Sequence, residues 1–79
     1  NSPNPARGIT KIPYSLPTNA NNAILVVSDA VGKIVKSFSL NGGRGIIQLD
    51  TNRLSAGAYH YTLYAGNRIL DAKQLVIVK

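Results

Sequence analysis

Residues 54–64 show the clearest alternation of apolar and polar positions in the chain. Tyr59, Tyr61 and Leu63 lie at every second position, with more polar side chains between them. Side chains of a β-strand point alternately to its two faces, so this spacing predicts a strand with one face in the core. We interpret it as the central strand of a small β-sandwich.

A tyrosine corner is predicted at the start of this strand. Leu54 is followed by a turn at Gly57 and then by Tyr59. In immunoglobulin-like sandwiches, a corner of this kind carries the chain from one sheet to the other, and a tyrosine hydroxyl binds the backbone a few residues upstream. We therefore expect a tyrosine hydroxyl to hold the crossing in this chain.

Apolar stretches elsewhere predict five further strands, which are Ile9–Leu16, Ala23–Ser28, Ile34–Leu40, Gly45–Asp50 and Ile69–Val78. Pro13 confines the first strand to a sheet edge or a bulge, because proline has no N–H for the hydrogen-bond ladder. The strand Ala23–Ser28 is apolar on both faces, which is typical of a central strand covered on both sides or partly covered by a neighbouring domain. Residues 50–54 predict a turn compatible with one round of 3₁₀ helix.

Two tight turns are predicted between strands. Asp29 at the first position and Gly32 at the fourth fit a type I turn whose last residue is left-handed. Gly66-Asn67 is the signal of a two-residue hairpin. These turns make the strands on either side of them antiparallel neighbours.

Pairing across the second hairpin predicts a bulge in the last strand. Continuous pairing places Leu63 opposite Leu70, which suits a core face. It also places Tyr59 opposite Gln74, which does not. We therefore predict a bulge near Lys73-Gln74 that shifts the face before the final apolar run.

These elements predict an all-β chain, a small immunoglobulin-like antiparallel β-sandwich of six or seven strands. The 79 residues suffice for one domain with a thin core, because a chain of this size buries only about 60% of its unfolded surface. Residues 1–8, with two prolines and a glycine, predict a linker, and residues 9–79 predict the sandwich.

The charge balance is basic, with nine Lys and Arg against three acidic residues and a net charge of +6. Basic surfaces favour anionic partners. The cations are scattered from Arg7 to Lys79 with no two adjacent, which indicates a solvated surface and no dedicated nucleic-acid stripe. The chain has no cysteine, and its apolar runs are far shorter than the ~20 residues of a membrane-spanning helix.

No set of side chains predicts a catalytic, cofactor or metal site. His60 is the only histidine, and a metal site would need carboxylate or cysteine ligands beside it. Asp29 and Asp50 lie in turns, where aspartate binds its own backbone. Asp71 is expected to face away from the core beside a cation. The loop Asn41–Gly45 lacks the helix that follows a phosphate-binding loop.

Two binding functions stay open on these residues alone. A sandwich that binds polysaccharide commonly uses a row of exposed aromatic rings. Tyr64 is expected to be exposed, and Tyr14 can face either way. One exposed ring is a weak platform for a sugar, as it is for a nucleic-acid base. An immunoglobulin-like spacer without a specific ligand is the other alternative, because the fold alone does not separate these functions.

Four segments, taken in order, resemble a known family. Asn4-Pro5 is followed by an apolar strand through residues 14–17, then by the hairpin Asp29–Lys33, the predicted corner and the terminal strand Lys73–Lys79. Over residues 3–79 the chain resembles a type A C-terminal sorting domain of the type IX secretion system of Bacteroidetes. The residues that match the family's structural motifs are Asn4, Pro5, Leu54, Gly57, Tyr59 and Tyr61.

The resemblance implies a sorting signal and not an enzyme. Such domains end large secreted cargo proteins that cross the inner membrane by their own signal peptide. The folded domain is recognised by shuttle or translocon proteins, in the periplasm or at the outer-membrane translocon. It directs the cargo through the translocon and is usually removed at the surface by a sortase-like cysteine peptidase. The implied location is the periplasm in transit, then the outer-membrane surface or the medium, with no insertion of the domain into a membrane.

Partner recognition is predicted in the terminal strand and the first hairpin, which carry the most specific parts of the resemblance. The terminal strand is apolar on both faces, so it can offer an edge for strand addition by a receptor or pair inside the sandwich. Exchange of this strand between two copies, giving a strand-swapped dimer, is also open. The predicted recognition residues are Gly32, Lys33, Lys73, Leu75, Val76, Ile77, Val78 and Lys79.

Overall fold

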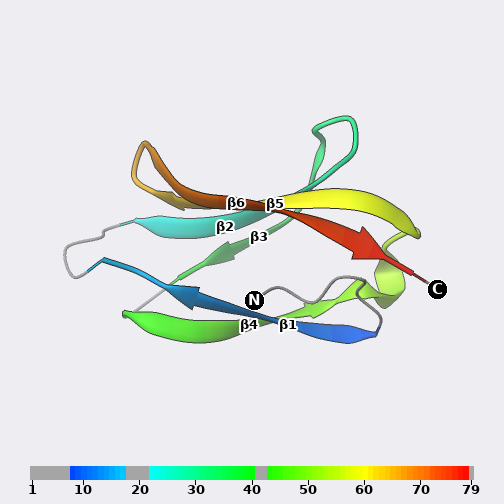
Figure 1. Cartoon of the computed structure of the whole chain (residues 1–79), viewed down its shortest axis with the longest axis horizontal. Helices are drawn as coiled ribbons and strands as arrows, with labels where there is room; N and C mark the ends of the chain where they lie inside the picture. Colours follow the sequence, from blue (N-terminus) through cyan, green and yellow to red (C-terminus); the bar gives the residue numbers. More distant parts are fainter. Residues whose placement is uncertain (1–7, 18–21, 41–42, 79) are drawn as a thin grey trace.

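Two antiparallel sheets are stacked as layers in the computed structural model, which describes residues 8–17, 22–40 and 43–78 (Figure 1). The smaller sheet pairs β1 with β4, and the larger sheet has the order β3-β2-β5-β6. The predicted all-β sandwich is confirmed, with six strands in these residues. Their bounds are β1 (Ile9–Ser15), β2 (Ala23–Asp29), β3 (Ile34–Ser39), β4 (Arg44–Asp50), β5 (Gly57–Ala65) and β6 (Arg68–Ile77), and a 3₁₀ helix, η1 (Thr51–Arg53), follows β4.

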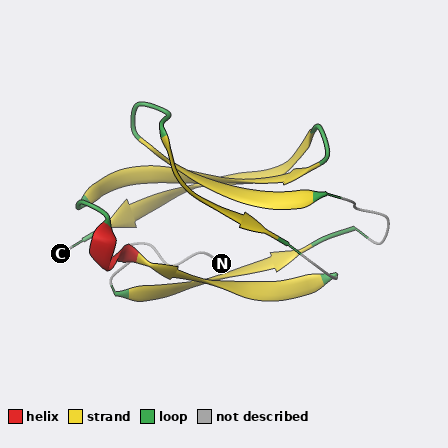
Figure 2. Ribbon diagram, turned by 180° about the vertical axis from the view of Figure 1, so that it is seen from behind, coloured by secondary structure: helices red, strands yellow, loops and turns green. Residues whose placement is uncertain are grey.

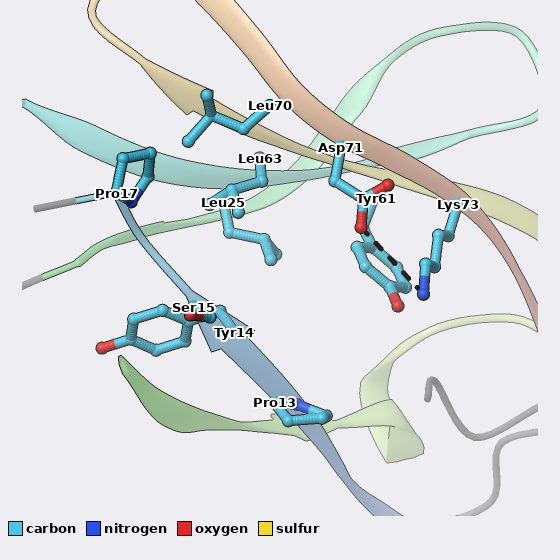
Figure 3. Close-up of a pocket in the computed structure, with 10 residues that line it drawn as sticks. All are labelled: Pro13, Tyr14, Ser15, Pro17, Leu25, Tyr61, Leu63, Leu70, Asp71 and Lys73. Atoms are coloured by element: carbon cyan, nitrogen blue, oxygen red, sulfur yellow. Dashed lines mark ion pairs between the residues drawn. The ribbon is translucent and has the colours of Figure 1, made fainter. Parts of the chain in front are cut away.

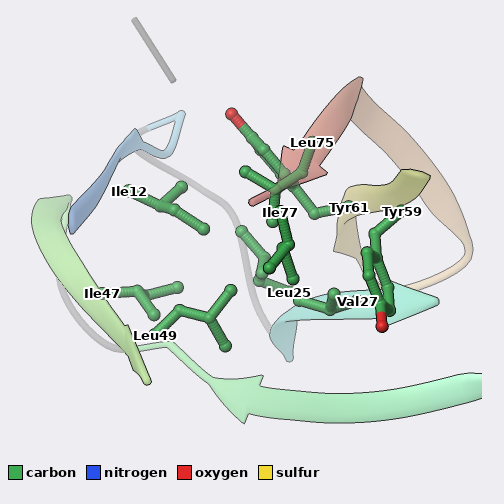
Figure 4. Packing of buried hydrophobic residues seen from close by; sticks show 9 residues of the cluster. All are labelled: Ile12, Leu25, Val27, Ile47, Leu49, Tyr59, Tyr61, Leu75 and Ile77. Carbon is green, nitrogen blue, oxygen red and sulfur yellow. The ribbon is translucent and has the colours of Figure 1, made fainter. Parts of the chain in front are cut away.

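The core lies between the two layers, where side chains from both sheets meet (Figure 4). Tyr59, Tyr61 and Leu63 are all 6% exposed, so the alternation along β5 points its apolar set inward as predicted. Burying one aliphatic or aromatic side chain of this size contributes roughly 1.5–3 kcal/mol. The clustered core residues are Ile12, Leu25, Val27, Ile47, Leu49, Tyr59, Tyr61, Leu75 and Ile77.

The tyrosine corner forms where the chain crosses from the smaller to the larger sheet. The Tyr59 hydroxyl donates to the backbone carbonyl of Ser55 at 2.7 Å, as the sequence predicts. The crossing begins at η1, which bridges the two layers at one end of the molecule (Figure 2). Thr51 in η1 is buried, and both its backbone N–H and its hydroxyl donate to the Gly8 carbonyl, which ties the start of β1 to the crossing.

Both predicted tight turns are confirmed. The Gly32 N–H donates to the Asp29 carbonyl at 3.0 Å, and Gly32 has a left-handed φ of +90°. In the second hairpin, Ala65 pairs with Arg68 across two residues, and Gly66 has a φ of +60°. A positive φ at the first central position is typical of a type II′ turn, where glycine avoids a steric penalty.

The predicted position of the bulge in the last strand is wrong. Leu63 pairs with Asp71 and Tyr64 pairs with Ile69, so Leu70 is the extra residue and the bulge lies beside the hairpin. This early shift places Leu75 opposite Tyr59. It lets Leu75 enter the core without a second irregularity, whereas a bulge near residues 73–74 would interrupt the middle of the β5–β6 ladder.

The inner position of Asp71 corrects a second expectation. The bulge turns Asp71 and Lys73 to the same face as Leu63 and Tyr61, toward the other sheet, and not away from it. Both side chains stay about half exposed, because β6 is the edge strand of its sheet. The predicted neighbouring cation is Lys73, whose Nζ lies 4.0 Å from the Asp71 Oδ2.

Strand β2 is interior, between β3 and β5, as its apolar sequence predicts. Its inward residues Ala23, Leu25 and Val27 are buried, but its outward residues Ile24 and Val26 are only half-buried. The sandwich therefore covers one face of this strand, and no layer of the described residues covers its second apolar face. Pro13 lies in β1, which pairs only with β4 among the described strands. The predicted edge position of β1 is therefore confirmed.

Candidate recognition surfaces

The carboxylates of the two turn aspartates accept hydrogen bonds from the backbone. The Asp29 carboxylate accepts the N–H groups of Val31 and Lys33 at 3.1 and 2.9 Å, and the Asp50 carboxylate caps η1 by accepting the N–H of Asn52 at 3.0 Å. Within residues 8–17, 22–40 and 43–78, no three His, Cys, Asp or Glu side chains come together as metal ligands. The same ranges contain no helix of the length and hydropathy needed to cross a membrane.

The β2–β3 hairpin, which carries two predicted recognition residues, ends in a hydrogen-bonded turn that projects from the sheet. Gly32 and Lys33 are both exposed, and the Lys33 carbonyl accepts the Asp29 N–H at 2.9 Å. Val31 at the apex is 88% exposed, so the tip presents an apolar side chain next to a cation. Sequence reasoning missed Val31, although its place between the turn residues Asp29 and Gly32 signals an outward position.

The terminal strand separates the other predicted recognition residues into two sets. Leu75 and Ile77 are 0% and 1% exposed and pack in the core, so they face no solvent in the folded domain. Val76 and Val78 are half-buried and Lys73 is exposed. Three family-motif or recognition residues lie outside the described ranges: Asn4, Pro5 and Lys79.

A cleft of about 360 Å³ opens between the edge strands β1 and β6 (Figure 3). Leu25, Leu63 and Leu70 line its apolar part, and the Asp71–Lys73 pair lies at its β6 side. Sequence reasoning missed this cleft, because it depends on the bulge at Leu70. The Asp71 carboxylate also accepts the N–H of Ala72 at 2.9 Å. The edge strand β6 therefore carries a charged pair beside the cleft. Inward-pointing charges of this kind discourage edge-to-edge pairing of strands.

The two tyrosines considered for sugar binding do not form one platform. Tyr14 lies on β1 of the smaller sheet, and its ring covers Gly45 of β4. Tyr64 lies on the larger sheet, where it pairs with Ile24 and is half-buried. Because the rings belong to different layers, the structure offers no aligned aromatic row to a polysaccharide among these residues.

Comparison with known protein families gives one match. A family model described as the secretion system C-terminal sorting domain matches residues 2–79. Searches of the curated proteins and of the solved structures give no significant match. The matched range contains the corner, the β2–β3 hairpin and all of β6.

Proposed function

Since the chain belongs to the C-terminal sorting domains of type IX secretion, we propose that it directs an attached cargo protein through the outer-membrane translocon. The observation that carries this proposal is the family match over residues 2–79. Membership of this family makes the domain a secretion signal attached to a cargo and exported toward the outer membrane or cell surface. The route through the periplasm to the surface or the medium is part of the proposal.

The domain is, in this proposal, a substrate of the export apparatus and not an enzyme. Residues 1–8 link the cargo to the sandwich of residues 9–79, and a sortase-like cysteine peptidase cuts in this linker. Hydrogen bonds from Thr51 to the Gly8 carbonyl support a boundary here, because they anchor the fold at that residue. An exposed junction next to a stable domain is a favourable site for proteolysis.

Shuttle or translocon proteins read the folded domain through the β2–β3 hairpin and β6. The exposed residues Gly32, Lys33 and Lys73 and the half-buried Val76 and Val78 are the accessible part of the predicted set. Leu75 and Ile77 contribute by holding β6 in the core. Lys79 belongs to the proposed set by its sequence position. A strand-swapped dimer through β6 is a competing use of the same edge.

A fusion tests the proposed function. Residues 1–79 are attached to the C-terminus of a fluorescent protein that carries an inner-membrane signal peptide, and the fusion is expressed in a strain with an intact type IX system and in a translocon mutant. Fluorescence on the surface or in the medium is expected only in the intact strain. Retention in the periplasm of both strains would refute the proposal for this chain in that host.

The proposed cleavage has its own readout. The fluorescent protein recovered from the intact strain is examined by mass spectrometry of its C-terminal peptide. We expect a new C-terminus within residues 1–8. A recovered fusion that still carries the complete sandwich would show that export occurs without removal of the domain.

A further inference from the structure

The solvent-facing side of the larger sheet, called here the outer face, is the strongest unused surface of the molecule. Side chains alternate between the two faces of each strand, so the outer face holds the residues that point away from the core. The buried positions of the opposite face include Leu25, Val27, Tyr59, Tyr61 and Leu63. Its fourteen residues are Ile24, Val26, Ser28, Ile34, Ser37, Ser39, Ala58, His60, Thr62, Tyr64, Ile69, Ala72, Gln74 and Val76.

None of these fourteen residues is Lys, Arg, Asp or Glu. Charged residues make up 15% of the chain, so about two would be expected among fourteen positions. The charged residues of β2, β3 and β6 pair with residues of the opposite, inward face, as Lys36 does with Val27 and Lys73 with Tyr61. A net charge of +6 is thus carried entirely outside this face, which indicates a surface kept free of charge.

Eight of the fourteen residues of the outer face are aliphatic or aromatic. Ile34 and Ile69 are 62% and 63% exposed, and Ile24, Val26 and Val76 are half-buried, with no layer above them among the residues that the structure describes. Polar but uncharged groups lie along β5, where Thr62 pairs with Val26 and His60 pairs with Ser28. A sheet face with this composition matches another flat, uncharged protein surface.

Its position agrees with a role in recognition. Ile34 on β3 follows Gly32-Lys33 directly, and Val76 lies on β6, so both predicted recognition segments border this face. Strand β1 lies in the smaller sheet, across the core from the outer face (Figure 1).

We propose that the outer face is the surface through which the export machinery binds the domain, and that the partner presents a flat, uncharged, apolar surface on a protein without net positive charge. This inference rests on the proposed function. A charged partner surface would be buried here without a counter-charge, which is costly. A second copy is disfavoured because it carries the same net charge of +6. Lipid hydrocarbon would leave the Thr62 and His60 groups without hydrogen-bond partners.

The size of the face indicates a transient contact. An outward residue occupies about 6.6 Å along a strand and about 4.8 Å across it, so fourteen positions cover roughly 450 Å². Stable complexes bury about 800 Å² on each partner. A surface of this size suits a signal that is bound and then released.

Matched isoleucine substitutions test the inference in the fluorescent-protein fusion. Ile69→Lys places a charge on the outer face, and Ile46→Lys is the control, because Ile46 is equally exposed at 62% but lies on the smaller sheet. Thr62→Lys adds a charge at the centre of the face. We expect at least a tenfold loss of extracellular fluorescence for Ile69→Lys and Thr62→Lys and less than a twofold change for Ile46→Lys. Unchanged melting of the purified Ile69→Lys fusion excludes unfolding as the cause.

The outcomes separate this inference from the proposed function. If the unmodified fusion is secreted and the Ile69→Lys and Thr62→Lys fusions are secreted equally well, the inference is wrong and the sorting function stands. If the unmodified fusion is not secreted in an intact strain, both fail. Sedimentation velocity adds a third result: a dimer abolished by Ile69→Lys without loss of secretion would identify the face as a contact between copies and overturn the proposal.

Discussion

Tyr59 connects the core and the chain crossing within a single side chain. Its ring is 6% exposed in the core, while its hydroxyl donates to the Ser55 carbonyl four residues upstream. The hydrogen bond closes the loop that leads from η1 into β5. Because the acceptor is a backbone carbonyl in a partly buried position, loss of the donor leaves that carbonyl without this partner.

Tyr59→Phe is therefore expected to lower the free energy of unfolding by about 1 kcal/mol, the usual size of one hydrogen bond of this kind. Tyr61→Phe is the matched control, since Tyr61 is equally buried but its hydroxyl lies at the cleft beside Lys73 (Figure 3). Urea denaturation of both variants gives the comparison. Equal losses for the two would contradict the special role of the corner hydroxyl.

Gly45 is required by the close approach of the Tyr14 ring. A Cβ atom at this position would lie 2.6 Å from the Tyr14 hydroxyl oxygen and 2.9 Å from its Cζ. We expect Gly45→Ala to cost about 1–3 kcal/mol, as overpacking does. Gly43→Ala meets no atom within 4 Å and is expected to stay within about 0.5 kcal/mol.

A double-mutant cycle with Tyr14→Ser checks the cause. If the clash is with the ring, Gly45→Ala should cost much less when the ring is absent, and the two changes should not be additive. Additive costs, measured by chemical denaturation, would place the strain elsewhere.

At the scale of elements, the β2–β3 hairpin depends on one left-handed glycine. Gly32 has a φ of +90° and meets no neighbouring atom, so only its backbone conformation limits substitution. Gly32→Ala is expected to cost about 1–2 kcal/mol, and Gly32→Asn less, because asparagine tolerates this conformation. Thermal melting of the two variants measures the difference, and an alanine variant as stable as the parent would refute the argument.

The C-terminal half of β6 combines packing with an exposed edge. Leu75 is 0% exposed, and its truncation to alanine is expected to cost about 2–5 kcal/mol. Val76→Ala should cost clearly less, because Val76 is half-buried on the outer face. Denaturation midpoints measure both. The same logic means that deletion of residues 75–79 would unfold the domain, so loss of secretion on deletion would not by itself identify a recognition site.

Local chemistry made the strands, both turns and the corner predictable. The period of two along β5, the asparagine after Gly66 and the aspartate before Gly32 each act within a few residues. The bulge was placed wrongly because two positions restore the same core face, and the choice depends on packing against the other sheet. For the same reason the inward turn of Asp71 and the cleft beside it could not be read from the sequence.

At the scale of the whole molecule, the two outer surfaces differ in character. The smaller sheet carries Lys11 and Arg44 on its solvent side, and the larger sheet carries no charge on its own. Sequence reasoning identified the apolar second face of β2 but not its neighbours, because strand order brings together residues far apart in the chain. The hairpin and terminal strand, predicted as separate recognition segments, border one continuous surface.

The ratio of extracellular to total fluorescence for the fusion of residues 1–79 is the most direct test of the central claim. It is measured in a strain with an intact type IX system and in a translocon mutant. The sorting function predicts a high ratio in the first strain and a background ratio in the second. Equal background ratios in both, with a folded sandwich confirmed by melting, would contradict the claim that this chain is a sufficient sorting signal.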